Sequence, residues 1–297
     1  MSVEALVLSE KKGGTVVNFK KVRRIALRVM LVLIAAFLVE MTVLVFISLE
    51  QNKTIMVTEY TVTHAEIPAA FEGKRIVHLT DLHNKDHGTA LSELVRRQNP
   101  DLILITGDWI TRTNDDITTA KRQAELLVGI APIYYVAGNH EAMSPHYAEL
   151  SIHLQSLGIE VLQNRAVDWT VEGESIQLVG LFDPDFGYLP ELTLPRLIEE
   201  EAYSILLYHR PELLETVSAC GADLVLSGHT HGGQIRLPLI GAVYGPDQGL
   251  FPKYDVGRFQ SGDTEMIISQ GLGEGAYMRI LTPPEVVVIT LDSPLVS

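Results

Sequence analysis

The sequence predicts an α/β fold in which two packed β-sheets are flanked by helices, with one membrane-crossing helix ahead of them. A nearly continuous apolar stretch covers residues 25–49. Beyond it, short apolar runs alternate with polar segments suited to helices, which is typical of sheets covered on their faces. The stretches 161–180 and 264–297 look instead like hairpins and meandering strands. This mixture predicts two sheets that contain both parallel and antiparallel pairs.

The apolar stretch is long enough to cross a bilayer. At about 1.5 Å per residue, a helix of this length exceeds the roughly 30 Å of a hydrocarbon core. Residues 1–30 hold seven Lys and Arg against two acidic residues, and basic residues beside a span favour the cytoplasmic side. We therefore expect a cytoplasmic tail (1–24), a single-pass cell-membrane anchor (25–49), and a folded domain (55–297) on the extracytoplasmic side.

A cleaved signal peptide is the alternative to a retained anchor. The segment 46–51 lacks an Ala-x-Ala-like cleavage site, which favours retention. The pair Arg23-Arg24 suggests export by the twin-arginine pathway, but an Arg-Arg pair alone is weak evidence for such a signal. No long Gly/Ser/Pro linker follows the apolar stretch, so the short tether should hold the domain close to the membrane surface.

The composition limits what the domain can bind. With 297 residues, 46% of them hydrophobic, the chain can form one large domain or two small ones plus an appendage. From Gln51 onward, 16 Lys and Arg stand against 33 Asp and Glu, and a body this acidic repels nucleic-acid backbones. The single cysteine, Cys220, excludes a disulfide framework and a Cys-based zinc site, and we expect it to be a small buried apolar residue.

Five apolar runs are expected to be strands, and each ends at residues that bind metal ions. The runs cover residues 75–80, 101–106, 132–137, 204–208 and 222–227, and helix-compatible segments lie at 89–98, 115–129, 146–157 and 211–219. The candidate ligands that follow the runs are Asp81, His83, Asp108, Asn139, His209, His229 and His231. In α/β sheets, ligands bind at the carboxyl ends of the strands. The glycines in these motifs fit sharp turns with close backbone approach to a ligand.

The chemistry of these side chains selects a class of metal. Imidazole, carboxylate and amide oxygen without thiolate suit divalent ions such as Mn²⁺, Fe²⁺ or Zn²⁺. Seven ligands are too many for one ion, but they suit two ions that share a bridging carboxylate at about 3.5–4 Å. The sequence therefore predicts a dinuclear metal centre.

The motif series resembles a known family. Asp-x-His, Gly-Asp, Gly-Asn-His-Glu, a single His and Gly-His-x-His follow in the order of the calcineurin-like metallophosphoesterases, over about residues 75–291. The resemblance implies a four-layer α/β/β/α sandwich with two mixed β-sheets. The segments 209–212, 231–238 and 283–287 are similar to a bacterial membrane-associated branch, and some members of the wider group act on phospholipid-like or nucleotide-diphosphate-lipid substrates. A lipid-linked or cell-envelope-derived phosphoester is thus one substrate class to consider.

The resemblance also implies a role for each residue. The first metal would be held by Asp81, His83, Asp108 and His231. The second would be held by Asp108, as the bridge, with Asn139, His209 and His229. His140 is similar to the family's leaving-group residue and is not itself a ligand. Trp109 stands where smaller aliphatic residues are common, and we expect it to reshape the mouth of the pocket as a substrate contact.

The expected reaction is hydrolysis of a phosphomonoester or phosphodiester. Two cations lower the pKa of a bridging water and neutralise the phosphoryl oxygens, so that a hydroxide can attack in line. His140 would assist the leaving group. Arg210 could clamp a phosphate oxygen or form a salt bridge, and Glu141 could orient a ligand ring or be a simple exposed acid.

Several alternatives stay open. A non-catalytic metal-binding scaffold of the same fold should have lost ligands, whereas this chain keeps all seven and His140; a nuclease would need the same metals, but the acidic body argues against it. The segment 237–252 is apolar and rich in Gly and Pro. It could be tucked under the domain, or it could be a lip that faces acyl chains or the bilayer. The other histidines, expected to have no ligand role, are His64, His78, His87, His146 and His153, with His78 expected in the core.

Overall fold

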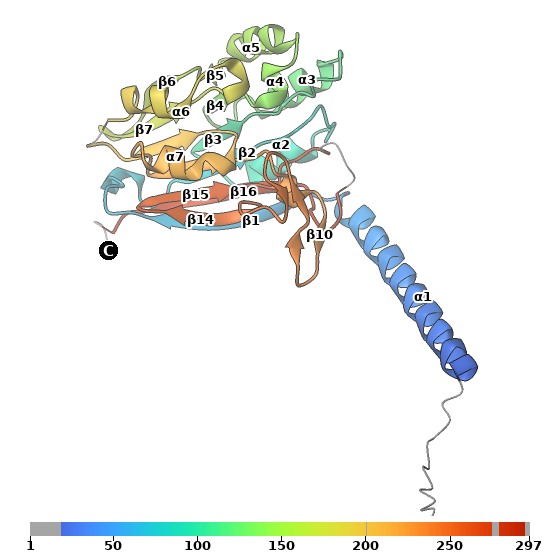
Figure 1. Ribbon diagram of the computed structural model, residues 1–297. Coiled ribbons are helices and arrows are strands. Elements are labelled where there is room, and N and C mark those ends of the chain that lie inside the picture. Colours follow the sequence, from blue (N-terminus) through green and yellow to red (C-terminus); the bar gives the residue numbers. More distant parts are fainter. Residues whose placement is uncertain (1–18, 200, 275–278, 295–297) are drawn as a thin grey trace, which may run out of the picture. The chain divides into compact units, whose positions relative to one another are not determined.

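The computed structural model describes residues 19–199, 201–274 and 279–294. The chain divides into two compact units, with the boundary between Phe46 and Ile47. Helix α1 (Phe19–Gln51) supplies the described part of the first unit, and its last turn belongs to the second (Figure 1). The helix is longer than the predicted span because no Gly or Pro interrupts it. Its best 18-residue window has a mean hydropathy of 2.8, so it could cross a membrane or serve as a signal sequence.

The second unit is built on two six-stranded sheets. The first sheet has the order β1 (Met56–Thr63), β16 (Glu285–Asp292), β2 (Arg75–Leu79), β3 (Leu102–Thr106), β4 (Ile133–Val136) and β5 (Glu160–Val161). Only the pair β16–β2 is antiparallel in this sheet; its other pairs are parallel. The sheet is therefore mixed, as the sequence and the resemblance predicted.

The second sheet has the same number of strands and is also mixed. Its order is β14 (Gly257–Ser261), β15 (Thr264–Ile268), β9 (Leu224–Ser227), β8 (Ser204–Leu207), β7 (Glu174–Gly180) and β6 (Arg165–Val171). Antiparallel pairs form at both edges, between β14 and β15 and between β7 and β6. The central pairs are parallel. The predicted hairpin at 161–180 is confirmed as the pair β6–β7.

Helices cover the outer faces of both sheets (Figure 1). The first sheet carries α2 (Ala90–Arg97), α3 (Thr118–Leu127) and α5 (Tyr147–Ser156), and the second carries α6 (Pro190–Thr193) and α7 (Leu214–Ser218). The short α4 (Asn139–Ala142) follows β4 directly. The remaining short elements are η1 (Ala69–Phe71), η2 (Pro184–Phe186), η3 (Leu194–Arg196), η4 (Pro211–Leu213), η5 (His231–Gly233), β10 (Arg236–Leu237), β11 (Gly241–Ala242), β12 (Tyr244–Gly245) and β13 (Gly249–Leu250).

The strands alternate between two cores because successive side chains point to opposite faces. In β3, Leu102 and Leu104 belong to the core between the sheets, and Ile103 and Ile105 to the core under the helices. The same alternation in the second sheet makes a third core under η3 and α7. The architecture is thus the four-layer α/β/β/α sandwich. Cys220 packs against the third core but is only partly buried, so the expectation of a small buried apolar residue is confirmed only in part.

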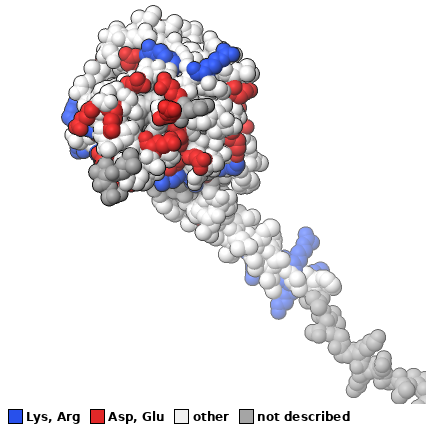
Figure 2. Space-filling model, turned by 90° about the vertical axis from the view of Figure 1, so that its left-hand side faces the viewer, with Lys and Arg blue, Asp and Glu red and all other residues white. Residues whose placement is uncertain are grey.

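Charge is distributed unevenly over the molecule. Figure 2 shows acidic side chains outnumbering basic ones on one face of the second unit, while basic side chains surround the beginning of α1. The basic residues of α1 are Lys20, Lys21, Arg23, Arg24 and Arg28.

Candidate metal centre

The predicted ligands come from both sheets. Three of the strands that precede them, β2, β3 and β4, lie in the first sheet, and β8 and β9 lie in the second. Strands β3 and β8 contact each other across the sandwich. The loops at the carboxyl ends of all five strands therefore meet at one end of the interface between the sheets.

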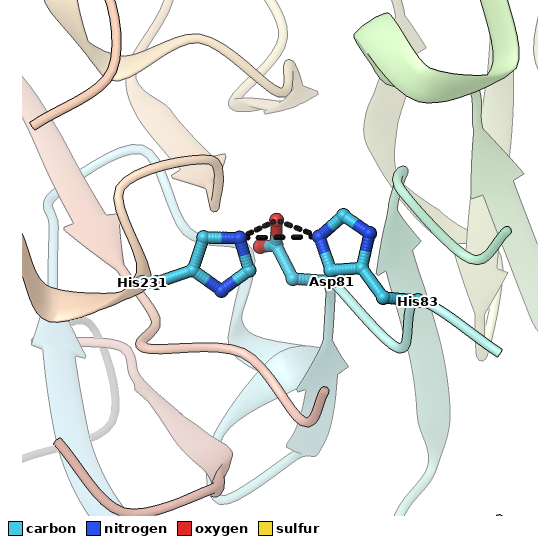
Figure 3. A group of neighbouring side chains, drawn as sticks. All are labelled: Asp81, His83 and His231. Atoms are coloured by element: carbon cyan, nitrogen blue, oxygen red, sulfur yellow. Dashed lines mark hydrogen bonds and ion pairs between the residues drawn. The ribbon is translucent and has the colours of Figure 1, made fainter. Parts of the chain in front are cut away.

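Asp81 has one carboxylate oxygen fixed by the protein and one that is not. Oδ2 accepts hydrogen bonds from the Thr80 hydroxyl at 2.9 Å and from the His229 backbone N–H at 3.0 Å. Oδ1 is buried and has no hydrogen-bond partner among the described residues. It lies 3.6 Å from Nε2 of His83 and 3.5 Å from Nε2 of His231, between the two rings (Figure 3). These three ligand atoms could hold one cation.

Asp108 connects this group to a second one. Its Oδ1 accepts a hydrogen bond from the His140 backbone N–H at 2.8 Å. Its Oδ2 lies 3.2 Å from Nε2 of His209 and 3.7 Å from Nε2 of His83. A single oxygen thus faces ligand atoms of both groups, the second of which contains Asp108, His209 and His229.

The histidines of the second group are oriented by their other ring nitrogens. Nδ1 of His209 donates to the Thr106 carbonyl at 2.7 Å, which leaves Nε2 facing Asp108. Nε2 of His229 lies 2.9 Å from Oδ2 of Asp247, so its Nδ1 is left for a ligand and lies 3.2 Å from Nε2 of His209. A carboxylate or carbonyl behind the ring is the usual arrangement for metal-binding histidine.

Asn139 is a further candidate ligand beside the second group. It is the first residue of α4, and its side chain lines the adjacent cavity. Its Oδ1 is buried without a hydrogen-bond partner in the described part of the chain. A buried amide oxygen in this state carries a desolvation penalty that a cation would remove.

The backbone is strained at the ligands. Positive φ angles, rare for residues other than glycine, occur at Asp81, His83, Asp108, His229 and His231. Such strain persists only where the surrounding structure over-determines it, and it clusters at functional sites. Two glycines make the approach possible: a Cβ at Gly138 would lie 2.4 Å from Oδ1 of Asp108, and one at Gly228 would lie 2.2 Å from Oδ2 of Asp81.

Positive charge stabilises the buried carboxylates of the cluster. Burial disfavours the charged form of Asp108, yet the neighbouring His209 holds the pKa of that carboxyl well below its usual range. Burial also disfavours charge on His209, but Asp108 raises its pKa to about 10. A proton on His209 thus does in part what a cation would do. The unpartnered oxygens and the facing ring nitrogens fit divalent metal ions.

Glu141 has a role that the sequence did not suggest. It is completely buried, so it is not an exposed acid, and it contacts the backbone, not a ligand ring. Its Oε2 accepts from the N–H groups of Asp108 and Gly138 at 2.7 and 2.8 Å, and its Oε1 accepts from Ile110 at 3.0 Å. Burial, with Asp108 nearby, raises the pKa of Glu141 to about 7, and two of these N–H bonds oppose the rise. Glu141 therefore ties the loop after β3 to the loop after β4.

A cavity of about 490 Å³ opens over the cluster. Asp108, Asn139, His229 and His231 lie in its lining, as does His140. Its remaining lining residues include Arg112, Met143, Asp185, Arg210, Gln234, Tyr244, Pro246 and Asp247. The volume is in the range of small-molecule sites.

Comparison with known proteins decides the family. Residues 74–233 match the family model described as calcineurin-like phosphoesterase. The chain belongs to this family. It is a metal-dependent phosphoester hydrolase with clustered His and Asp side chains at the expected place.

Relatives of this phosphoesterase occur in several bacteria. An uncharacterized metallophosphoesterase of Bacillus subtilis, YkuE, is 33% identical over 257 residues, which cover 80% of this chain and 86% of the relative. The phosphodiesterase YaeI of Escherichia coli is 30% identical and covers 73% of this chain and 82% of its own length. An uncharacterized metallophosphoesterase of Campylobacter jejuni, Cj0846, is 28% identical over 96% of this chain and 74% of its own length.

The structure corrects the prediction that Trp109 and Arg210 contact the substrate. Trp109 is fully buried, its indole N–H donates to the Ala120 carbonyl at 2.9 Å, and it is not in the cavity lining. The expectation that it shapes the pocket mouth is therefore wrong: the residue after Asp108 points into the core under the helices. Arg210 does line the cavity, but Asp183 binds it through two nitrogens, at 2.7 and 3.0 Å. Asp185 and Asp247 add bonds at 2.9 and 2.5 Å, so the salt-bridge alternative is the one observed.

Asp247 and Arg112 are two cavity residues that the sequence did not mark. Asp247 pairs with both His229 and Arg210, and Arg112 lines the cavity without an ion pair among the described residues. Neither follows a strand in a recognisable motif, so no local signal marks them. His78 is buried in β2, as expected, with Nε2 2.7 Å from the Thr106 hydroxyl.

Proposed function

We propose that this protein hydrolyses a phosphomonoester or phosphodiester at a pair of divalent cations (Mn²⁺, Fe²⁺ or Zn²⁺). The position of Asp108 is the main support, because its Oδ2 faces the ligand atoms of both groups. The first cation would be held by Asp81, His83, Asp108 and His231. The second would be held by Asp108, Asn139, His209 and His229. When bound, the cations would polarise the phosphoryl oxygens and lower the pKa of a water molecule.

His140 is suited to assist the leaving group. Its Nδ1 accepts the Arg112 backbone N–H at 3.2 Å, so the proton of the neutral ring sits on Nε2. Burial lowers the pKa of His140 to about 4, so the ring is neutral at pH 7. The ring lines the cavity, and its Nε2 lies 4.0 Å from Oδ2 of Asp108. The Nε2–H group can therefore donate a hydrogen bond to an oxygen that leaves beside the cluster and stabilise its negative charge.

Arg112 is suited to bind the substrate's phosphate. Its guanidinium contacts only Met143 Sδ, at 3.0 Å, among the described polar contacts. It is exposed at the cavity, whereas Arg210 is already neutralised by carboxylates. A guanidinium without a carboxylate partner can form bidentate bonds to phosphate oxygens. We assign Arg112, in place of Arg210 and Trp109, as the substrate-binding residue.

The apolar helix is proposed to be a retained anchor. Its length and hydropathy fit a bilayer, and the basic residues at its beginning favour a cytoplasmic amino terminus. The domain proposal follows: a tail at 1–24, an anchor at 25–49 and an extracytoplasmic phosphoesterase domain at 55–297. Alkaline-phosphatase fusions at Asn52 and before residue 19 test it. Activity of the Asn52 fusion alone supports the orientation, and the reverse pattern contradicts it.

The catalytic proposal is tested by metal analysis followed by hydrolysis of p-nitrophenyl phosphate and bis-p-nitrophenyl phosphate with added Mn²⁺. Asp108→Asn should lose both metal and turnover, because it removes the charge that faces both groups. Asp115→Asn, at a residue with a 98% exposed side chain, is the control and should keep both. Unchanged turnover in Asp108→Asn would refute the site.

The same assay separates the remaining alternatives. The related YaeI is a phosphodiesterase by name, and faster turnover of the bis ester would extend that activity to this chain. A non-catalytic scaffold would retain metal but hydrolyse neither ester. The complete set of clustered side chains favours the enzyme.

A further inference from the structure

The segment between η5 and β14 forms a small protruding structure, the apolar hairpin, which we define as residues 236–251. Its strands β10 and β11 pair, as do β12 and β13, and it projects from the body in Figure 1. Residues 237–246 contain no charged side chain, in a domain that is otherwise strongly acidic. A segment of this composition that folded against the domain would have buried apolar side chains.

The apolar side chains of the hairpin are exposed instead. Leu239 is 108% exposed, Leu250 70%, Phe251 64% and Ile240 59%. The alternative that the segment is tucked under the domain is therefore wrong. Four large apolar side chains on one small protrusion form the kind of patch that marks an interaction site.

At the tip of the hairpin, an apolar residue adopts a backbone conformation that is unfavourable for it. The Ile240 N–H donates to the Leu237 carbonyl, so residues 237–240 form a tight turn with Pro238 at its second position. Leu239 follows with φ +67°, in the left-handed region where such turns favour glycine or asparagine. A leucine in this conformation costs conformational free energy, and it gains no packing contact within the domain. This combination points to an apolar partner outside the chain.

The base of the hairpin lies beside the end of the membrane helix. Ile235 forms a β-bridge with Ile280, and the Arg236 N–H donates to the Ile280 carbonyl at 2.9 Å. The next residue, Leu281, donates its N–H to the Ser48 hydroxyl at 3.1 Å. Ser48 is in the last turn of α1 and is buried against the domain. Ile280 contacts the base of the hairpin, and the next residue, Leu281, contacts the last turn of α1. The hairpin therefore begins close to the point at which α1 meets the domain.

We propose that the apolar hairpin inserts into the interface of the same bilayer that α1 spans. The bilayer is the apolar surface that the end of α1 brings closest to the hairpin, and apolar side chains with no charge enter the headgroup boundary favourably. The hairpin also carries Tyr244, Pro246 and Asp247, which line the metal cavity. Its insertion would hold the mouth of the cavity at the membrane surface. The proposal rests on α1 being a retained anchor.

Site-specific fluorescence tests the insertion in the full-length protein. In a Cys220→Ser background, single cysteines are placed at Leu239 and Leu250 and labelled with an environment-sensitive dye. Ile152 (69% exposed, in α5) serves as the water-facing control, and Val32 (67% exposed, in α1) as the lipid control. The labelled proteins are reconstituted into phosphatidylcholine vesicles with or without nitroxide-labelled lipid. Turnover of bis-p-nitrophenyl phosphate in each variant verifies that the domain is folded.

Insertion predicts that nitroxide lipid quenches the dyes at Leu239 and Leu250 about twofold or more, as at Val32, and leaves the dye at Ile152 unchanged. Quenching at Val32 alone would overturn the hairpin proposal and keep the anchor. No quenching at Val32 would overturn the anchor, and the hairpin proposal with it. Shielding of Leu239 and Leu250 from aqueous iodide without nitroxide quenching would indicate a protein contact, and it would also overturn insertion.

Discussion

The carboxylate of Glu141 accepts a 2.7 Å hydrogen bond from the backbone N–H of Asp108. The same oxygen accepts from Gly138, one residue before the candidate ligand Asn139. Two loops that each carry a candidate ligand of the proposed second cation site are therefore held by one buried side chain. Glu141 acts through the backbone, and this explains how α4 keeps its position although it is only four residues long.

Glu141→Gln should destabilise the protein by about 1–3 kcal/mol, because the amide NH₂ would face backbone N–H donors and leave them unpaired. It should also weaken metal retention, since the loops of Asp108 and Asn139 would separate. Thermal unfolding and metal content measure the two effects. Glu149→Gln, which alters an exposed ion pair with Lys121, is the control and should change both little. Equal behaviour of the two variants would contradict the bridging role.

Removing the metals should lower the melting temperature. Without cations, the buried negative charges of Asp81 and Asp108 are offset mainly by the neighbouring histidines. Ligand-linked stabilisation is about 3–4 kcal/mol when metal is present at 100 to 1,000 times its Kd. EDTA should therefore shift the transition of the wild-type chain, while Asp108→Asn should unfold at the same temperature with and without EDTA. An EDTA shift of equal size in Asp108→Asn would argue against the site.

His78 should make the metal-free domain sensitive to acid. Burial lowers its pKa to about 3, below the usual 6.5. Below pH 6.5, His78 binds a proton in the unfolded chain but stays neutral in the folded chain. This contribution to stability is therefore present above pH 6.5 and is lost as the pH falls toward 3. The loss approaches about 1.4 kcal/mol per pH unit. His78→Gln should flatten the fall in melting temperature between pH 7 and 5 in EDTA, and His153→Gln, at a partly buried ring that pairs with Glu125, is the histidine control.

Arg210→Gln should act on stability more than on substrate binding. Its removal leaves the fully buried carboxylate of Asp183 without its cation, and breaking such a pair costs about 3–5 kcal/mol. Denaturant unfolding measures the loss. Arg122→Gln, from an exposed pair with Asp86, should cost less than about 1 kcal/mol. A large rise in KM of Arg210→Gln at unchanged stability would restore the phosphate-clamp alternative.

Arg112→Met should show the opposite pattern. The side chain is exposed and unpaired among the described residues, so stability should change by less than about 0.5 kcal/mol. Loss of a charge-assisted bond to phosphate should raise KM about 10-fold or more. Steady-state kinetics with p-nitrophenyl phosphate tests this, and an unchanged KM would remove Arg112 from the substrate site.

The sequence pointed to the candidate ligands because each lies just after an apolar run. The order Asp81, His83, Asp108, Asn139, His209, His229 and His231 could be read without knowing which strands pair. The helices at 89–98 and 146–157 also agree with α2 and α5 to within one residue at each end. Periodicity and motif spacing are local properties, so they can be predicted from the sequence.

Contacts between distant segments could not be predicted in this way. Glu141 and Arg112 act between the loops after β3 and β4, and Asp247 contacts residues that follow β8 and β9, so these roles depend on which strands pair. Trp109 shows the converse: its position beside Asp108 suggested the pocket, but the left-handed turn at Asp108 directs the indole into the core.

The sequence by itself determined the family, the candidate ligand set and the apolar helix, because these depend on residue type and spacing along the chain. Only the tertiary structure decided which carboxylate oxygen faces both groups, which arginine is already neutralised, and that the apolar hairpin is exposed. Those properties depend on the partner that each side chain meets. Partners separated by tens to hundreds of residues are set by the packing of the whole sandwich.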